Sequence, residues 1–140
     1  MYCTLDDLTL MVDEVRLIEL TDDDGLGVID QARIDEAIST AQGEVDGYLQ
    51  ERYTVPLDPV PPLIKGACRD IALYNLYSRK YDRLPEVRQK RYDNAVKLLT
   101  NVARGTITLG VATPPTETAA ETMQVSTPPA IFSADELEKF

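Results

Sequence analysis

The most regular hydrophobic pattern in the chain begins at Asp30 and ends near Tyr53. Its apolar residues recur at steps of three and four, as they do along one face of an α-helix, and most charged residues lie between them. The apolar positions are Ile34, Ala37, Ile38, Ala41, Val45, Tyr48 and Leu49. This pattern predicts an amphipathic helix of about six turns, with Asp30 as its N-terminal cap.

A second helix is predicted after a proline-rich connector over residues 54–62. The connector holds four prolines and cannot continue a helix, whereas Pro61 and Pro62 suit the first turn of the next one. The apolar residues that follow cover most of a helix's circumference: Leu63, Ile64, Ala67, Ile71, Tyr74, Leu76 and Tyr77. A helix of this kind is expected at the centre of the core.

A third long helix is predicted from Pro85 to Arg104, where apolar residues again recur at helical spacing. Gly105 is a suitable C-terminal cap for it. Residues 106–109 then alternate between polar and apolar, which indicates a short strand or an extended edge.

Two shorter helices and an acidic loop are predicted before Asp30. Thr4 can cap a first helix whose first turn holds carboxylates, and the apolar residues between 15 and 20 indicate a second. Residues 21–27 include three aspartates and two glycines, as a solvated loop does. An EF-hand counted from Asp22 would need a glutamate at its twelfth position, where Arg33 stands, so we expect no calcium or other metal site.

Residues 112–140 differ in composition from the rest of the chain. They are small, polar and rich in proline, which predicts an extended arm, yet they end in a group of large apolar residues. We expect this apolar tip to bind a partner; it consists of Ile131, Phe132, Leu137 and Phe140. The predicted fold class is therefore all-α: a helical domain of four to five helices with a short β-element over residues 1–111, and a C-terminal arm over residues 112–140.

Charge is unevenly distributed along the sequence. The formal net charge is −10; residues 1–50 hold thirteen acidic and two basic side chains, whereas residues 79–104 hold eight basic and three acidic ones. A chain this acidic repels phosphate backbones and anionic membrane surfaces. We therefore expect neither a nucleic acid nor a membrane as the partner of the whole molecule.

The separation of charge favours a contact between copies of the chain. An acidic surface of one copy can meet a basic surface of the next, and such a head-to-tail contact closes into a ring when the rotation allows it. The predicted contact residues are Arg88, Lys90 and Arg91 on one side and Asp22, Asp23 and Asp24 on the other. Two other interpretations stay open: ordinary solvated helix faces, and a basic helix that faces DNA in a channel.

The residues that most enzymes use are missing or isolated. The chain has no histidine, so its serines and cysteines lack the commonest general base, and it has no glycine-rich phosphate-binding motif. Carboxylate pairs are plentiful in the acidic half, which leaves a two-carboxylate hydrolase formally open. They lie on predicted solvent-facing sides of helices, however, so we expect no enzymatic activity and no cofactor.

The two cysteines do not have metal-ligand spacing. Cys3 precedes the first predicted helix, and Cys68 lies in the apolar central helix, where a cysteine usually serves as a small buried hydrophobic residue. Free thiols are typical of a reducing compartment.

The first residues lack the features of a signal peptide, and no apolar run approaches the roughly 18 residues needed to span a bilayer. We therefore expect a cytoplasmic protein.

Several stretches of the chain form a recognisable set: MYCTLDDL at 1–8, IDQARIDEAI at 29–38, EVDGYL at 44–49, PPLI at 61–64 and CRDIALYNL at 68–76, with an Arg-Tyr pair at 52–53 and another at 91–92. Together they resemble a protein family of Mu-like bacteriophages. The resemblance covers roughly residues 1–111, and the Pro-Pro and Phe-Ser pairs near the end of the chain are also similar.

The resemblance implies a structural role in the phage particle. The family is encoded among virion morphogenesis genes and is similar to small helical adaptors, which form a ring, usually of twelve copies, between the portal and the tail. It implies the portal protein, a tail-terminator or stopper protein and further copies of the chain as partners, with DNA only as channel contents, and a place in the neck of the virion. Two alternatives stay open: a minor tail or neck-completion protein that caps the tail tube, and a regulatory module whose acidic half mimics DNA.

Overall fold

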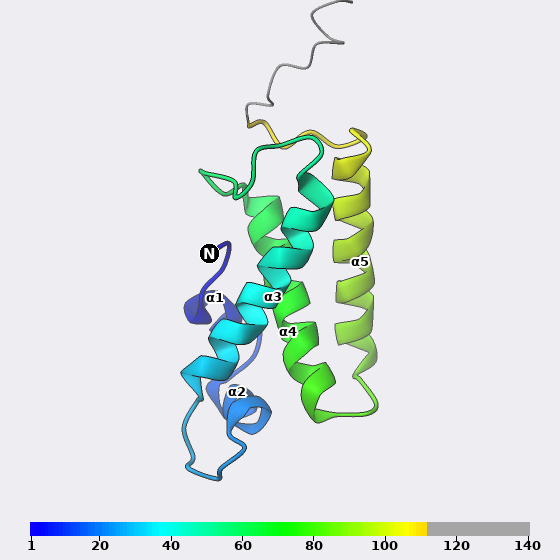
Figure 1. Ribbon diagram of the computed structural model, residues 1–140. Coiled ribbons are helices and arrows are strands. Elements are labelled where there is room, and N and C mark those ends of the chain that lie inside the picture. The colour runs from blue at the N-terminus through cyan, green and yellow to red at the C-terminus, as the bar shows by residue number, and fades with distance from the viewer. Residues whose placement is uncertain (112–140) are drawn as a thin grey trace, which may run out of the picture.

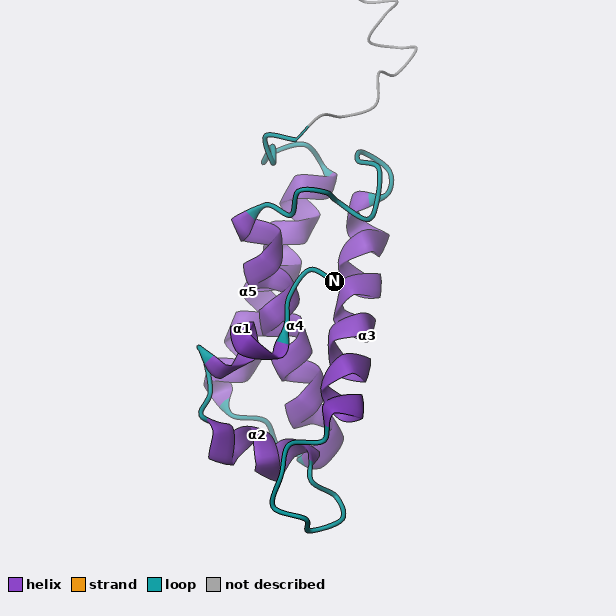
Figure 2. Cartoon of the chain, turned by 90° about the vertical axis from the view of Figure 1, so that its left-hand side faces the viewer, coloured by secondary structure: helices purple, strands orange, loops and turns teal. Residues whose placement is uncertain are grey.

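The computed structural model describes residues 1–111, which fold into five α-helices (Figure 1). They are α1 (Leu5–Thr9), α2 (Glu14–Thr21), α3 (Gln31–Leu49), α4 (Pro62–Lys80) and α5 (Glu86–Ala103). The three long helices α3, α4 and α5 form an antiparallel bundle, and α1 and α2 lie on the side of α4 that is away from α5 (Figures 1 and 2). The prediction of an all-α domain is confirmed.

α4 is the central element of the domain. It contacts each of the other four helices. Its buried residues lie on several sides of the helix: Ile64, Ala67, Cys68, Ile71, Ala72, Leu73, Leu76 and Tyr77. Pro61 is the N-cap and Pro62 the first helical residue, as the sequence predicts. The expectation that this helix lies at the centre of the core is confirmed.

α3 begins where its sequence predicts and ends earlier than expected. The Asp30 carboxylate accepts a hydrogen bond from the Ala32 backbone N–H at 3.0 Å and so caps the first turn. The helix ends at Leu49, whose carbonyl accepts hydrogen bonds from both the Arg52 and Tyr53 N–H groups. Tyr53, near which the helix is predicted to end, instead lies in the turn that follows the helix and is buried there.

The short N-terminal helices are fixed by their caps. Thr4 and Asp7 form a capping box at the start of α1, and the Asp13 side chain accepts a hydrogen bond from the Arg16 N–H at the start of α2. Both predicted helices are confirmed, although α1 ends at Thr9 and does not continue towards Val12.

The prediction of a short β-element at residues 106–109 is wrong. The Thr106 and Ile107 N–H groups donate to the Asn101 carbonyl at the end of α5, and the Leu109 N–H donates to the Tyr53 hydroxyl. These donors are used by a helix terminus and a side chain, and residues 1–111 contain no strand that could pair with this segment. Gly105 has a φ of +82° and ends α5, so its predicted role as the cap is confirmed.

Within the five helices of this domain, none is both long and apolar enough to cross a membrane.

Candidate functional site: the acidic loop and the ends of α3 and α4

The acidic loop, which we define as residues 22–30 between α2 and α3, has a defined conformation built around Asp22. The Asp22 carboxylate accepts hydrogen bonds from the Leu26 N–H at 2.9 Å and the Gly27 N–H at 2.7 Å. Gly25 and Gly27 have φ angles of +74° and +73°, which side chains with a Cβ rarely adopt. The backbone hydrogen bonds, first that of Gly27, lower the pKa of Asp22 because they stabilise the carboxylate.

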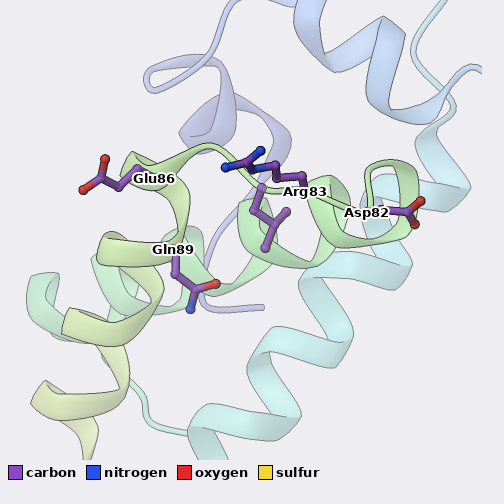
Figure 3. A pocket seen from close by; sticks show the side chains of 5 residues that line it. Asp82, Arg83, Glu86 and Gln89 are labelled. Carbon is purple, nitrogen blue, oxygen red and sulfur yellow. The ribbon is translucent and has the colours of Figure 1, made fainter.

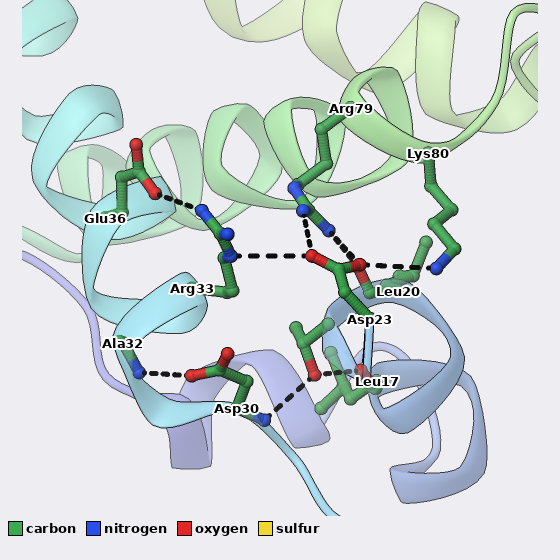
Figure 4. A network of polar contacts seen from close by, with 10 residues as sticks. Leu17, Leu20, Asp23, Asp30, Ala32, Arg33, Glu36, Arg79 and Lys80 are labelled. Atoms are coloured by element: carbon green, nitrogen blue, oxygen red, sulfur yellow. Dashed lines mark hydrogen bonds and ion pairs between the residues drawn. The ribbon is translucent and has the colours of Figure 1, made fainter. Parts of the chain in front are cut away.

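A buried threonine joins the two ends of this loop. The Thr21 hydroxyl donates to the Leu17 carbonyl at 2.8 Å and accepts from the Asp30 N–H at 3.1 Å (Figure 4). Thr21 has no solvent exposure, so both of its hydrogen bonds are made away from water. The threonine therefore couples the end of α2 to the start of α3.

Asp23 joins the loop to two of the long helices. Its carboxylate lies 2.6 Å from Nη2 of Arg79 and 3.4 Å from Nζ of Lys80, both in the last turn of α4, and 3.6 Å from Nε of Arg33 on α3 (Figure 4). Arg79 also donates to the Leu20 carbonyl at 2.8 Å. The Arg79 hydrogen bond, assisted by Lys80, lowers the pKa of Asp23 to about 2.

The loop so anchored exposes apolar residues at one end of the molecule. Leu26 is 72% exposed and Val28 57% exposed, and Asp24 is also exposed and makes no ion pair within residues 1–111. These two side chains offer apolar area that a protein partner could cover.

The basic residues predicted on α5 differ in how free they are. Arg88 lies over the Tyr77 ring, with its guanidinium carbon 5.7 Å from the ring centroid, and Arg91 approaches Asp70 at 3.9 Å. Within residues 1–111, Lys90 pairs only with Glu86, one turn earlier on the same helix, and its side chain is 71% exposed. Of these three cations, Lys90 is therefore the most available to a partner.

The structure does not bring the two predicted charge clusters together within one chain. Asp23 meets Arg33, Arg79 and Lys80 instead of the cations of α5. Sequence reasoning missed this junction, although Arg79 and Lys80 stand in the last turn of a predicted helix. A contact between the acidic loop of one copy and α5 of another stays a prediction.

The predicted arm residues Ile131, Phe132, Leu137 and Phe140 lie outside the described residues.

The turn between α4 and α5 borders an open hollow of about 590 Å³. It is lined by Asp82, Arg83, Leu84, Glu86 and Gln89 (Figure 3). The two carboxylates point to opposite sides of the hollow, so they do not form a pair that could share a substrate. Residues 1–111 also contain no group of three or more histidine, cysteine, aspartate or glutamate side chains arranged to hold a metal ion.

Comparison with known proteins matches most of the chain to one family. A family described as Bacteriophage Mu, Gp36 matches residues 2–127. The chain is 33% identical over 84 residues to the Mu-like prophage FluMu protein gp36 of Haemophilus influenzae, a match that covers 60% of this chain and 57% of that protein. It is 30% identical over 135 residues to gene product J of Escherichia phage Mu, which covers 94% of each chain.

Proposed function

Because the chain belongs to the Bacteriophage Mu Gp36 family, we propose that it is a structural virion protein, a head-completion or head–tail adaptor that forms a ring between the portal and the tail. The observation that carries this proposal is the family match over residues 2–127, together with the likeness to gene product J over 94% of both chains. Membership of a Mu phage family favours a role in the phage particle. The adaptor position within the particle is the finer part of the proposal.

The described domain is suited to a structural role. Its three long helices form a bundle with α4 at the centre, and its acidic loop is fixed to the ends of α3 and α4 while exposing Leu26 and Val28. A subunit that keeps its shape loses little conformational entropy when it joins a ring. In this proposal the chain therefore acts by binding other proteins of the particle and not by catalysis.

In this proposal each copy makes contacts of two kinds. Neighbouring copies associate side by side through unlike surfaces, which include Lys90 on one side and Asp24 on the other, and this arrangement generates a closed ring. The apolar tip of the C-terminal arm binds the portal protein or a neighbouring subunit, and the opposite side of the ring receives the tail-terminator or stopper protein. DNA passes through the ring as channel contents, and assembly takes place in the cytoplasm of the bacterial host before the protein becomes part of the neck.

The test is complementation of a Mu-like phage from which the family gene has been deleted. We expect the deleted phage to accumulate DNA-filled heads and free tails, and expression of this chain to restore joined particles, counted by electron microscopy. A chain ending at residue 111 serves as the matched variant: it keeps the described helices and lacks the arm. Joined particles in the absence of any copy would contradict the proposal, and tails with an unfinished tube tip would point to the tail-capping alternative.

A further inference from the structure

The two cysteines of the chain meet inside the domain, although 64 residues separate them in the sequence. The Sγ atoms of Cys3 and Cys68 are 3.6 Å apart, and neither side chain has any solvent exposure. Both are free thiols. This distance places the two sulfur atoms in van der Waals contact.

The contact between the two cysteines depends on the hydrogen bonds that fix the N-terminal segment ahead of α1. Tyr2 is buried; its hydroxyl donates to the Asp46 carboxylate on α3 and accepts from the Leu57 N–H at 2.9 Å. The Tyr2 N–H donates to the Gln42 side chain at 3.1 Å. These bonds hold the segment beside α4 (Figure 2), where Cys3 meets Cys68 in the N-terminal half of the helix.

We propose that Cys3 and Cys68 form an intramolecular disulfide when the protein is exposed to a peroxide, and that the disulfide fastens the N-terminal segment to α4. The sulfur atoms need to approach each other by about 1.5 Å to reach the disulfide bond length of about 2.05 Å. Cys3 lies in an extended segment outside any helix, so a change of its side-chain torsion and a small backbone shift supply this movement. The proposal is independent of the adaptor role.

The reaction balances with hydrogen peroxide as the oxidant. The hydrogen bond with Cys68 lowers the pKa of Cys3, and the hydrogen bond with Cys3 and burial raise the pKa of Cys68, so Cys3 is the first of the two to ionise. The Cys3 thiolate attacks peroxide, forms an S–O bond and releases hydroxide as the O–O bond breaks. The Cys68 sulfur then attacks the sulfenic sulfur, the S–O bond breaks, and water leaves. Two thiols lose two electrons, and one peroxide becomes two waters.

Access to the buried thiols requires local opening of the N-terminal segment. The segment ahead of α1 is held by the three hydrogen bonds of Tyr2 and is followed by a helix of five residues. Short terminal segments open without global unfolding, and peroxide is small enough to enter when they do. The disulfide would then prevent this opening and restrict the unfolded chain through a long closed loop, which raises the melting temperature by roughly 10 °C or more.

The experiment treats the purified full-length chain with hydrogen peroxide. We expect the number of free thiols, measured after unfolding, to fall from two to none, and the intact mass to fall by two hydrogens. After digestion with trypsin without reducing agent, peptide 1–16 should be linked to peptide 66–69. The melting temperature should rise, and dithiothreitol should return it to its starting value.

Cys3→Ala and Cys68→Ala are the matched variants. Each retains a single buried thiol and should show no rise in melting temperature after peroxide. The proposal is overturned if the wild-type chain keeps both thiols, gains oxygen as sulfinic or sulfonic acid, or forms only disulfides between chains. A linked pair of peptides without any rise in melting temperature would overturn the fastening role.

Discussion

At the scale of single residues, Asp23 determines how the acidic loop is attached to the bundle. It is the common partner of Arg33, Arg79 and Lys80, which come from two different helices. Its neighbours in the loop act differently: Asp22 holds the loop's own backbone, and Asp24 faces solvent. Three consecutive aspartates of identical chemistry therefore have three separate roles, and only their surroundings distinguish them.

We predict that Asp23→Asn destabilises the domain more than Asp24→Asn does. Both substitutions remove one negative charge at adjacent positions, but only the first removes the carboxylate that receives the Arg79 hydrogen bonds. The measurement is the urea midpoint of each variant at neutral pH, followed by circular dichroism. Equal midpoints for the two variants would show that the ion pairs of Asp23 contribute nothing to folding.

The contribution of Asp23 should depend on pH in a defined direction. Its folded-state pKa is lowered to about 2, below the value of about 3.9 that an unfolded aspartate has. The stabilisation is therefore fully present above about pH 4 and is lost as the pH falls through 2. We expect the melting temperatures of wild type and Asp23→Asn to differ above pH 4 and to converge as the pH approaches 2; a constant difference across this range would contradict the assignment.

At the scale of elements, the long helices could be predicted from the sequence and the short extended segment could not. α3, α4 and α5 each contain many apolar residues at helical spacing, with a cap or a proline at the start, so local information determines them. Residues 106–109 alternate as a strand does, but a strand requires a partner, and their backbone donors are taken by Asn101 and Tyr53. The alternation of polar and apolar residues does not reveal either the helix-end contacts with Asn101 or the long-range contact with Tyr53.

Replacing glycine by alanine should have opposite effects on stability at two positions, one at the end of a helix and one inside a helix. At Gly105 the φ is +82°, which L side chains rarely adopt, so Gly105→Ala should cost about 1–2 kcal/mol of unfolding free energy. At Gly43, inside α3, an added Cβ meets nothing within 4 Å, so Gly43→Ala should stabilise the domain by about 0.5–1 kcal/mol. Urea denaturation of both variants gives the signs; a stabilised Gly105→Ala would refute the cap.

At the scale of the whole molecule, the asymmetry of charge could be predicted from the sequence, but the ion pairs that part of this charge forms within the chain could not. Part of the basic charge of residues 79–104 is used within the chain, since Arg79 and Lys80 reach Asp23 and Arg91 approaches Asp70. The separation of charge along the sequence predicts Asp22, Asp23 and Asp24 as one side of a contact between copies. The attachment of the acidic loop to α3 and α4, and its exposed Leu26 and Val28, depend on tertiary contacts that no motif records.

Two charges that remain exposed in the described domain can guide association between copies. Lys90 is 71% exposed, and Asp24 is exposed and lacks an ion pair within the described domain. We predict that Lys90→Glu or Asp24→Lys alone weakens self-association, and that mixing the two variants restores it, because each then meets the opposite charge. Lys97→Glu, on the same helix with the same change of charge, is the control and should have a smaller effect.

Salt gives an independent measure of the same contact. Exposed charges are screened over about 8 Å at physiological ionic strength, so association of the wild-type chain should weaken as salt is added, while the mixture of Lys90→Glu and Asp24→Lys should follow the same salt dependence. Sedimentation velocity at several protein and salt concentrations measures both effects. If association is indifferent to salt and to both reversals, the separation of charge along this chain serves only to keep its helices solvated, and the charge-guided contact between copies is refuted.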